Sequence, residues 1–148
     1  MIFRRAEIRD AEELAEIRKK QLMDEGQKPD VNMDKELLGY FREKMESGEL
    51  VQWIAEEDGK TAATGAIIFM VYPPSFTNPS GRKGYIANMY TADEYRGRGL
   101  AGRIIELLEE EARERGITSL ILFASAVGRK AYLKSGFHDD DFLMEKFI

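Results

Sequence analysis

The feature that most constrains this chain is the stretch from Asn88 to Gly102, a glycine-rich turn between a predicted strand and a predicted helix. Gly97 and Gly99 let the backbone approach a ligand closely, because neither carries a Cβ. The first N–H groups of the helix have no partner inside it, and the helix dipole adds partial positive charge there. Three arginines add more: Arg96, Arg98 and Arg103. The stretch predicts a site for an anion such as a phosphate, although a plain strand–helix turn with solvated arginines has the same pattern.

Composition excludes several kinds of site. A chain of 148 residues can form one domain, residues 1–148, with a substantial buried core. The net charge of −5 argues against nucleic acid as a partner. The chain has no cysteine and one histidine, His138, which excludes disulfides and a cysteine nucleophile and argues against a metal centre.

The distribution of apolar residues gives an expectation about location. The N-terminus becomes charged at once and has no signal-type apolar region. The longest apolar run, 66–72, is too short to cross a bilayer. We therefore expect a soluble, cytoplasmic protein without a membrane partner.

The first half of the chain reads as strands and two helices. A capping box of Asp10 and Glu13 predicts the start of the first helix. Asp58-Gly59 predicts a tight hairpin, and the continuous apolar run before Tyr72 is typical of a strand covered on both faces. The alternation of Val51, Trp53 and Ala55 with polar residues predicts a half-buried strand. The expected elements are strands 2–8, 51–56, 61–72 and 84–91 and helices 11–25 and 34–47, with a long loop at 73–83.

The second half predicts a strand–helix–strand unit after the turn. Leu100, Ile104, Leu107, Leu108 and Ala112 follow the helical period. A strand over 118–124 comes next, so the unit should form a parallel pair with a right-handed crossover. A short helix over 126–135 follows, and 137–148 is predicted to close the sheet as a pair of strands around Asp139, Asp140 and Asp141. Two ion pairs are expected on the outer face of the long helix, Glu109–Arg113 and Glu111–Arg115.

The turn also matches the dinucleotide-binding pattern G-x-G-x-x-G literally. That pattern needs an acidic residue at the end of the next strand, to hold a ribose. Here the strand ends in Phe123-Ala124-Ser125, without an acid. A nicotinamide-binding protein is therefore an alternative that depends on the glycines alone.

Two motifs together give the chain a family resemblance. Residues 96–101, Arg-Gly-Arg-Gly-Leu-Ala, fit R/Q-x-x-G-x-A/G, and residues 132–137, Tyr-Leu-Lys-Ser-Gly-Phe, follow after one helix and one strand. In this order and spacing the chain resembles the GCN5-related N-acetyltransferase (GNAT) family over nearly its whole length. The resemblance implies the acyl-CoA N-acyltransferase fold. This is an α+β (α/β/α) sandwich around a mixed, mostly antiparallel sheet of about six or seven strands, with a splayed parallel pair.

The resemblance also implies roles for individual residues. Tyr132 matches the tyrosine that protonates the departing thiolate. The strand residues matching those that contact the pantetheine arm and the acetyl carbonyl are Met89, Tyr90 and Thr91. The turn residues expected to bind the pyrophosphate of coenzyme A are Arg96, Gly97, Arg98, Gly99, Leu100, Ala101 and Gly102. Ser125, where many members have asparagine, and Gly128 complete the expected cofactor-binding set.

The implied reaction is direct transfer in a ternary complex. Acetyl-CoA and a primary amine, either a small molecule or a peptide amine, would give an amide and coenzyme A, without a metal. Asn88 stands where some members have a glutamate base, so either a carboxylate elsewhere acts through water or the amine arrives neutral. Tyr40 and Trp53 could line the acceptor side or pack in the core. The sequence leaves open the acceptor, a homodimer, and a non-catalytic domain that binds acyl-CoA as a sensor or subunit.

Overall fold

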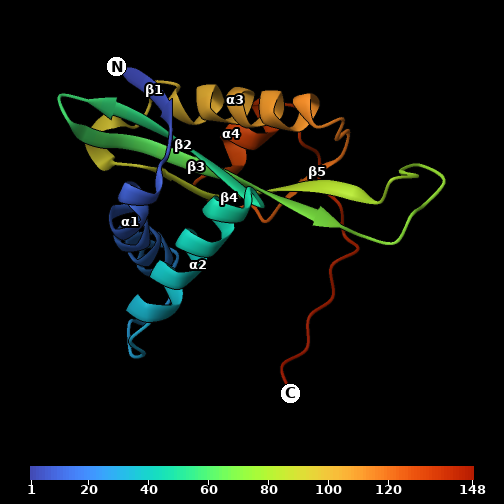
Figure 1. The fold of residues 1–148 in the computed structure, drawn as a ribbon, viewed down its shortest axis with the longest axis horizontal. Coiled ribbons are helices and arrows are strands. Elements are labelled where there is room, and N and C mark those ends of the chain that lie inside the picture. The colour runs from blue at the N-terminus through green and yellow to red at the C-terminus, as the bar shows by residue number, and fades with distance from the viewer.

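The computed structural model describes residues 1–148 as one sheet with helices on both faces (Figure 1). The sheet has five strands in the order β1-β2-β3-β4-β5, which are Ile2–Arg5, Leu50–Glu57, Lys60–Val71, Arg82–Thr91 and Leu120–Leu122. The first three neighbouring pairs are antiparallel and β4 and β5 are parallel. The predicted mixed, mostly antiparallel sheet with one parallel pair is confirmed.

Two layers of helix enclose this sheet. Helices α1 (Ala11–Asp24) and α2 (Asp34–Ser47) cover one face, and α3 (Leu100–Glu114) and α4 (Arg129–Lys134) lie on the other (Figure 1). Leu14, Phe41 and Ile54 belong to the core on the α1/α2 side, while Ile67 and Ile104 belong to the core under α3. The 3-10 turns η1 (Ile8–Asp10) and η2 (Asp93–Tyr95) precede α1 and α3. No helix is long and apolar enough to cross a membrane.

Because helices cover both faces, β2 has no solvated side, and the prediction of a half-buried strand is wrong for Gln52. Its side chain is 2% exposed, and its amide donates to Thr64 Oγ1 at 2.8 Å. The Thr64 hydroxyl in turn donates to the carbonyl of Trp53 at 2.7 Å. Buried polar groups between two helical layers need such partners; the amide nitrogen of Gln52 has one, and its amide oxygen has none within the chain.

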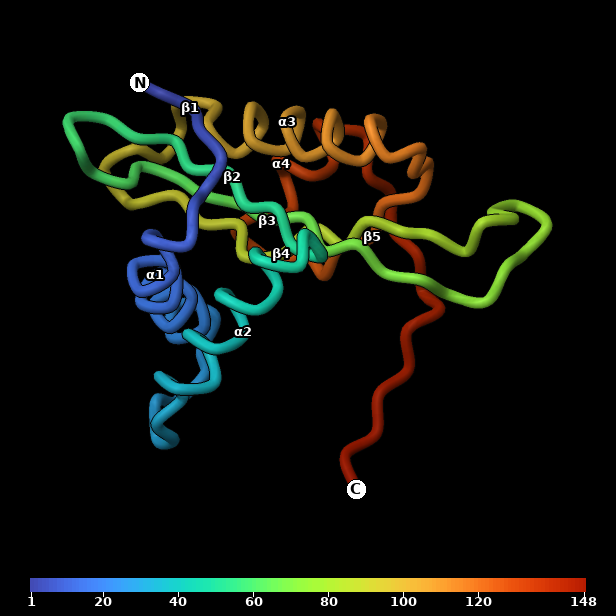
Figure 2. Tube along the Cα trace, viewed as in Figure 1, coloured from blue at the N-terminus to red at the C-terminus, as the bar shows by residue number.

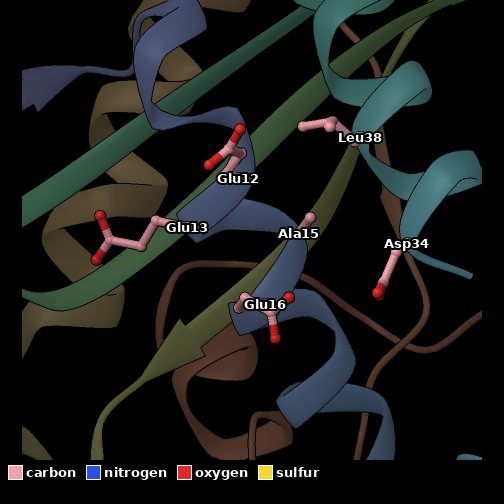
Figure 3. Close-up of a pocket in the computed structure, with 6 residues that line it drawn as sticks. All are labelled: Glu12, Glu13, Ala15, Glu16, Asp34 and Leu38. Carbon is pink, nitrogen blue, oxygen red and sulfur yellow. The ribbon is translucent and has the colours of Figure 1, made fainter.

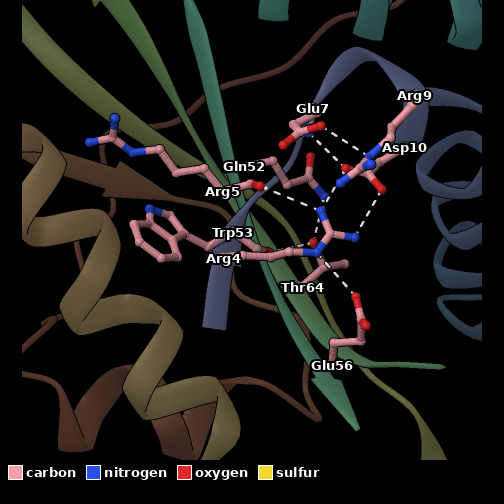
Figure 4. Close-up of polar contacts among 9 residues, drawn as sticks. All are labelled: Arg4, Arg5, Glu7, Arg9, Asp10, Gln52, Trp53, Glu56 and Thr64. Atoms are coloured by element: carbon pink, nitrogen blue, oxygen red, sulfur yellow. Dashed lines mark hydrogen bonds and ion pairs between the residues drawn. The ribbon is translucent and has the colours of Figure 1, made fainter. Parts of the chain in front are cut away.

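The carboxylate of Asp10 joins β1 to the start of α1, and it does not form the predicted box with Glu13. The capping box lies one turn earlier, between Glu7 and Asp10. Asp10 accepts hydrogen bonds from Arg4 Nη1 at 2.8 Å and Arg4 Nη2 at 3.0 Å, and from the Glu7 amide at 2.7 Å (Figure 4). The Arg4 guanidinium lowers the pKa of Asp10 below its ordinary value. Helical periodicity could not predict this arrangement of Asp10, because its partner Arg4 lies on β1, outside any helix.

Glu111 is buried under α3, so the prediction that it faces outward is wrong. The ion pair with Arg115 is present at 3.0 Å, as is Glu109–Arg113 at 2.8 Å. However, the Glu111 side chain is only 2% exposed and also accepts from Arg5 Nε at 2.6 Å and Trp53 Nε1 at 3.0 Å. Glu111 therefore connects α3 to β1 and β2.

The C-terminal segment, residues 137–148, contains no strand, so the predicted closing pair and the six- or seven-strand count are wrong. The segment runs past β5 and away from the body of the molecule (Figure 2). Its apolar residues suggest strands in sequence, but a strand needs a neighbour to satisfy its backbone groups, and within the chain this segment has none. β5 consequently forms the open edge of the sheet.

Candidate active site

A bulge in β4 marks the centre of the candidate site. Thr64 of β3 pairs with Tyr90 of β4, and Ala66 pairs with Ala87. One residue of β3, Gly65, therefore lies opposite two residues of β4, Asn88 and Met89. Asn88 has φ of 54°, a left-handed conformation that asparagine tolerates better than most residues. A Cβ on Gly65 would lie 2.3 Å from Met89 Sδ. Gly65 thus leaves room for the bulge, a feature that is frequent beside active sites.

Just before this bulge β4 loses its parallel partner. β4 and β5 pair only from Gly84 to Ile86 and from Leu120 to Leu122. β4 continues to Thr91, whereas no strand follows β5. Met89, Tyr90 and Thr91 therefore lie on a stretch whose β5 side has no strand, and its backbone groups there are available to a ligand.

The turn after β4 has the conformation that an anion site needs. Gly97 and Gly99 have φ of 76° and 77°, and no other group lies within 4 Å of a Cβ built on either. Gly99 is the N-cap of α3, and no side chain caps this end. The first amides of α3, in which Leu100 is buried and Ala101 and Gly102 are half-buried, have no intrahelical partner.

The arginines of the turn contact the protein itself. Arg96 pairs with Asp93 at 2.9 Å and donates to the Thr91 carbonyl at 3.3 Å. Arg98 stacks on Tyr95, with 5.0 Å from guanidinium carbon to ring centre, and donates to the Glu94 carbonyl at 3.2 Å. Both arginines brace the turn through these contacts. An anion would therefore be bound mainly by the free backbone amides and attracted by the helix dipole.

Tyr132 is 9% exposed, on α4, and its hydroxyl makes no hydrogen bond within the chain. Burial raises the pKa of Tyr132 to about 12, and the charge of Glu25 adds to the rise. The phenol is therefore protonated at neutral pH. Its ring packs on Gly128, where an added Cβ would lie 2.8 Å from ring atom Cε2. Ser125 Oγ accepts from the Gly128 amide at 3.1 Å, so Ser125 and Gly128 form the turn that positions Tyr132.

The two residues considered for the acceptor side, Tyr40 and Trp53, lie on opposite faces of the sheet. Trp53 lies with Glu111 on the α3 side of the sheet. Tyr40 lines a cavity of about 220 Å³ on the α1/α2 side, together with Tyr85 and Asn88 of β4 and with Arg18 of α1. Sequence reasoning missed Arg18 and Tyr85, because neither belongs to a motif and only the packing of α1 on β4 brings them together.

Another cavity, of about 370 Å³, lies between α1 and α2 and is lined by carboxylates (Figure 3). Lys19 pairs with two of them, Glu16 at 2.7 Å and Asp34 at 2.6 Å. None of the residues predicted for the active site lines this cavity. No group of histidine, cysteine, aspartate and glutamate side chains in the chain could hold a metal ion.

Comparison with known proteins identifies the family. The model of the Acetyltransferase (GNAT) family matches residues 11–137. The chain belongs to this family. The resemblance found in the sequence is confirmed, and the short β4/β5 pair, the uncapped turn and Tyr132 all lie within the matched residues.

Solved and curated relatives agree with this placement. A structure from Clostridium acetobutylicum, described as a predicted acetyltransferase with acetyl-CoA, is 46% identical with a TM-score of 0.96, and the match covers 99% of this chain and 95% of that one. The structure of glucosamine-6-phosphate N-acetyltransferase from Arabidopsis thaliana is 25% identical with a TM-score of 0.75, covering 99% and 97%.

The curated sequences match this GNAT acetyltransferase over a shorter stretch. The Arabidopsis thaliana glucosamine 6-phosphate N-acetyltransferase is 27% identical over 93 residues, 63% of this chain and 60% of that protein. The rice (Oryza sativa subsp. japonica) glucosamine 6-phosphate N-acetyltransferase 1 is 33% identical over 79 residues, 53% of this chain and 46% of that protein. The family and these relatives support an N-acetyltransferase.

Proposed function

We propose that this protein transfers the acetyl group of acetyl-CoA to a primary amine by direct attack in a ternary complex. The observation that carries the proposal is the continuity of one binding path. The stretch of β4 at 89–91, which has no strand on its β5 side, leads through residues 92–98 to the uncapped N-terminus of α3 at Gly99. A ligand with an extended arm and a pyrophosphate fits that path, because the strand offers backbone hydrogen bonds and the helix end offers amides.

The residues present fit coenzyme A at each part of this path. The amides from Gly97 to Gly102 would hold the pyrophosphate, with Arg96 and Arg98 bracing the turn. Met89, Tyr90 and Thr91 would bind the pantetheine arm through their backbone, and Ser125 would add a hydroxyl. When bound, the cofactor supplies the acetyl group as a thioester. A β4 amide directed at the acetyl carbonyl would stabilise negative charge that develops there.

Tyr132 would donate a proton or hydrogen bond to the sulfur that leaves. A phenol with a pKa of about 12 carries its proton throughout the neutral range, so it is always in the donor form. The chain has no cysteine, which excludes an acyl-cysteine intermediate. Asn88 cannot accept the amine proton, so either a carboxylate elsewhere takes that proton through water or the amine arrives neutral.

The first test is calorimetry with acetyl-CoA, coenzyme A and NADH on one preparation, followed by thiol release with a panel of amines that includes glucosamine 6-phosphate. Binding of both thio-cofactors but not NADH, together with turnover of an amine, is the expected result. Tight binding of acetyl-CoA without turnover of any amine would favour the alternative of a non-catalytic acyl-CoA sensor or subunit. NADH binding in competition with coenzyme A would favour a nicotinamide-binding protein.

Replacing Tyr132 with phenylalanine tests the catalytic assignment. We expect Tyr132→Phe to lower kcat at least tenfold, because general acid catalysis contributes on the order of 10²–10⁴ in rate. Affinity for coenzyme A should be unchanged, since the ring still packs on Gly128. Tyr95→Phe, a tyrosine on the turn, is the matched control and should keep kcat. Unchanged turnover in Tyr132→Phe would contradict the role without affecting the fold.

A further inference from the structure

A cavity beside the β4 bulge carries an inference about the acceptor. The cavity of about 220 Å³ is lined by residues of α1, α2, β3 and β4, and Asn88 of the bulge forms part of its wall. It therefore adjoins Met89, where the proposed acetyl-binding stretch begins. Phe41 and Ile68 supply apolar wall, and Tyr40 and Tyr85 supply hydroxyls. Small-molecule sites typically combine apolar walls with a few convergent polar groups in this way.

The positive charge in this cavity is Arg18, and it has no carboxylate partner. Its side-chain hydrogen bond runs from Nη1 to Gln21 Oε1 at 3.0 Å, and no ion pair includes it. Burial raises the pKa of Tyr40 and of Tyr85, and the charge of Arg18 acts against the rise in both. Arg18 is therefore close to both phenols, which are hydrogen-bond donors at neutral pH.

Building on the proposed function, we infer that this cavity binds the acceptor and that the acceptor amine carries an anionic group, a phosphate or a carboxylate, held by Arg18. A guanidinium presents its donors in a planar fork that matches either oxyanion. The Tyr40 and Tyr85 hydroxyls would donate to the same group. The amine end would then lie toward Met89, where the acetyl carbonyl is expected.

Matched pairs of amines test this inference. O-phosphoethanolamine and ethanolamine differ only in the phosphate, and glycine and glycinamide differ only in the carboxylate charge. We expect one anionic member to be preferred, and Arg18→Gln to raise its KM about 10- to 100-fold while changing the KM of its neutral counterpart less than about twofold, since hydrogen bonds to charged groups are worth roughly 1.5–3 kcal/mol. Arg9→Gln, with the same charge change at a site outside the cavity, should match the wild type.

Calorimetry of the same amines with the coenzyme A complex keeps the test independent of turnover. Weaker binding of the anionic member to Arg18→Gln supports the inference even if no amine is acetylated, in which case the proposed function alone fails. Equal wild-type affinity for charged and neutral members, or equal losses for both in Arg18→Gln, would overturn the inference and leave the proposed function intact.

Discussion

At the scale of single residues, Glu111 should matter most to stability. Its carboxylate accepts hydrogen bonds from Arg5, Trp53 and Arg115 and is 2% exposed. Glu111→Ala removes the shared acceptor of these three donors from a buried position, so we expect a loss of about 2–4 kcal/mol in the free energy of unfolding, measured in urea. Glu109→Ala on the same helix removes a more exposed pair and should cost less than about 1 kcal/mol. Equal losses in the two variants would contradict this view of Glu111.

Asp10 should make the free energy of unfolding depend on pH in the acidic range. Arg4 lowers the pKa of Asp10 in the folded state. The stabilisation is therefore fully present above the unfolded pKa, near about 3.9, and is lost as the pH falls through the lower folded value. We expect Asp10→Asn to be less stable than the wild type at pH 7, and the difference to shrink below about pH 4. Asp30→Asn, at an exposed position, is the control, and a difference that stays constant down to pH 3 would contradict the prediction.

At the scale of elements, the sequence predicted the helices and strands that have a strong hydrophobic periodicity. The long helix was predicted from its apolar face, and the turn before it from its glycines, and both are present. β5 is shorter than predicted because no strand pairs with it on the side away from β4. The hydrophobic pattern of residues 118–124 does not show whether such a neighbouring strand exists. The bulge in β4 was also out of reach, since it depends on the fit of Gly65 under Met89, two residues far apart in the chain.

The turn itself allows a test of its backbone. Gly99 has φ of 77° with open space around it, so Gly99→Ala should be destabilised by about 1–2 kcal/mol through the backbone alone. Because Gly99 is the N-cap of α3, the same variant should also bind coenzyme A more weakly by calorimetry. Gly102→Ala, inside the helix and equally open, should instead gain about 0.5–1 kcal/mol. If Gly99→Ala is as stable as the wild type, the left-handed conformation is not required there.

At the scale of the whole molecule, local patterns predicted individual elements but not what joins them. The crossover rule predicted the parallel pair of β4 and β5, and the family resemblance implied the layers and the mixed sheet. Tyr132 and the turn were predicted from motifs, and their roles stay predictions. The cavity that we propose for the acceptor was not predicted, because Arg18 and Tyr85 lie on elements that only tertiary packing brings together. The free C-terminal segment was misread for the same reason, since its apolar residues do not report that it has no neighbouring strand within the chain.

Cofactor binding should stabilise the whole domain, because the proposed path runs from the sheet to the start of α3. A ligand at 100 times its Kd adds about 2.7 kcal/mol to the free energy of unfolding, which for a chain of this length raises Tm by roughly 5–10 °C. Acetyl-CoA and coenzyme A should both produce this shift in a thermal melt, and NADH at the same concentration should not. The shift should be smaller in Gly99→Ala, whose helix end is altered, and the same in Glu109→Ala, which lies far along α3. A full shift in Gly99→Ala would place the pyrophosphate away from the helix N-terminus.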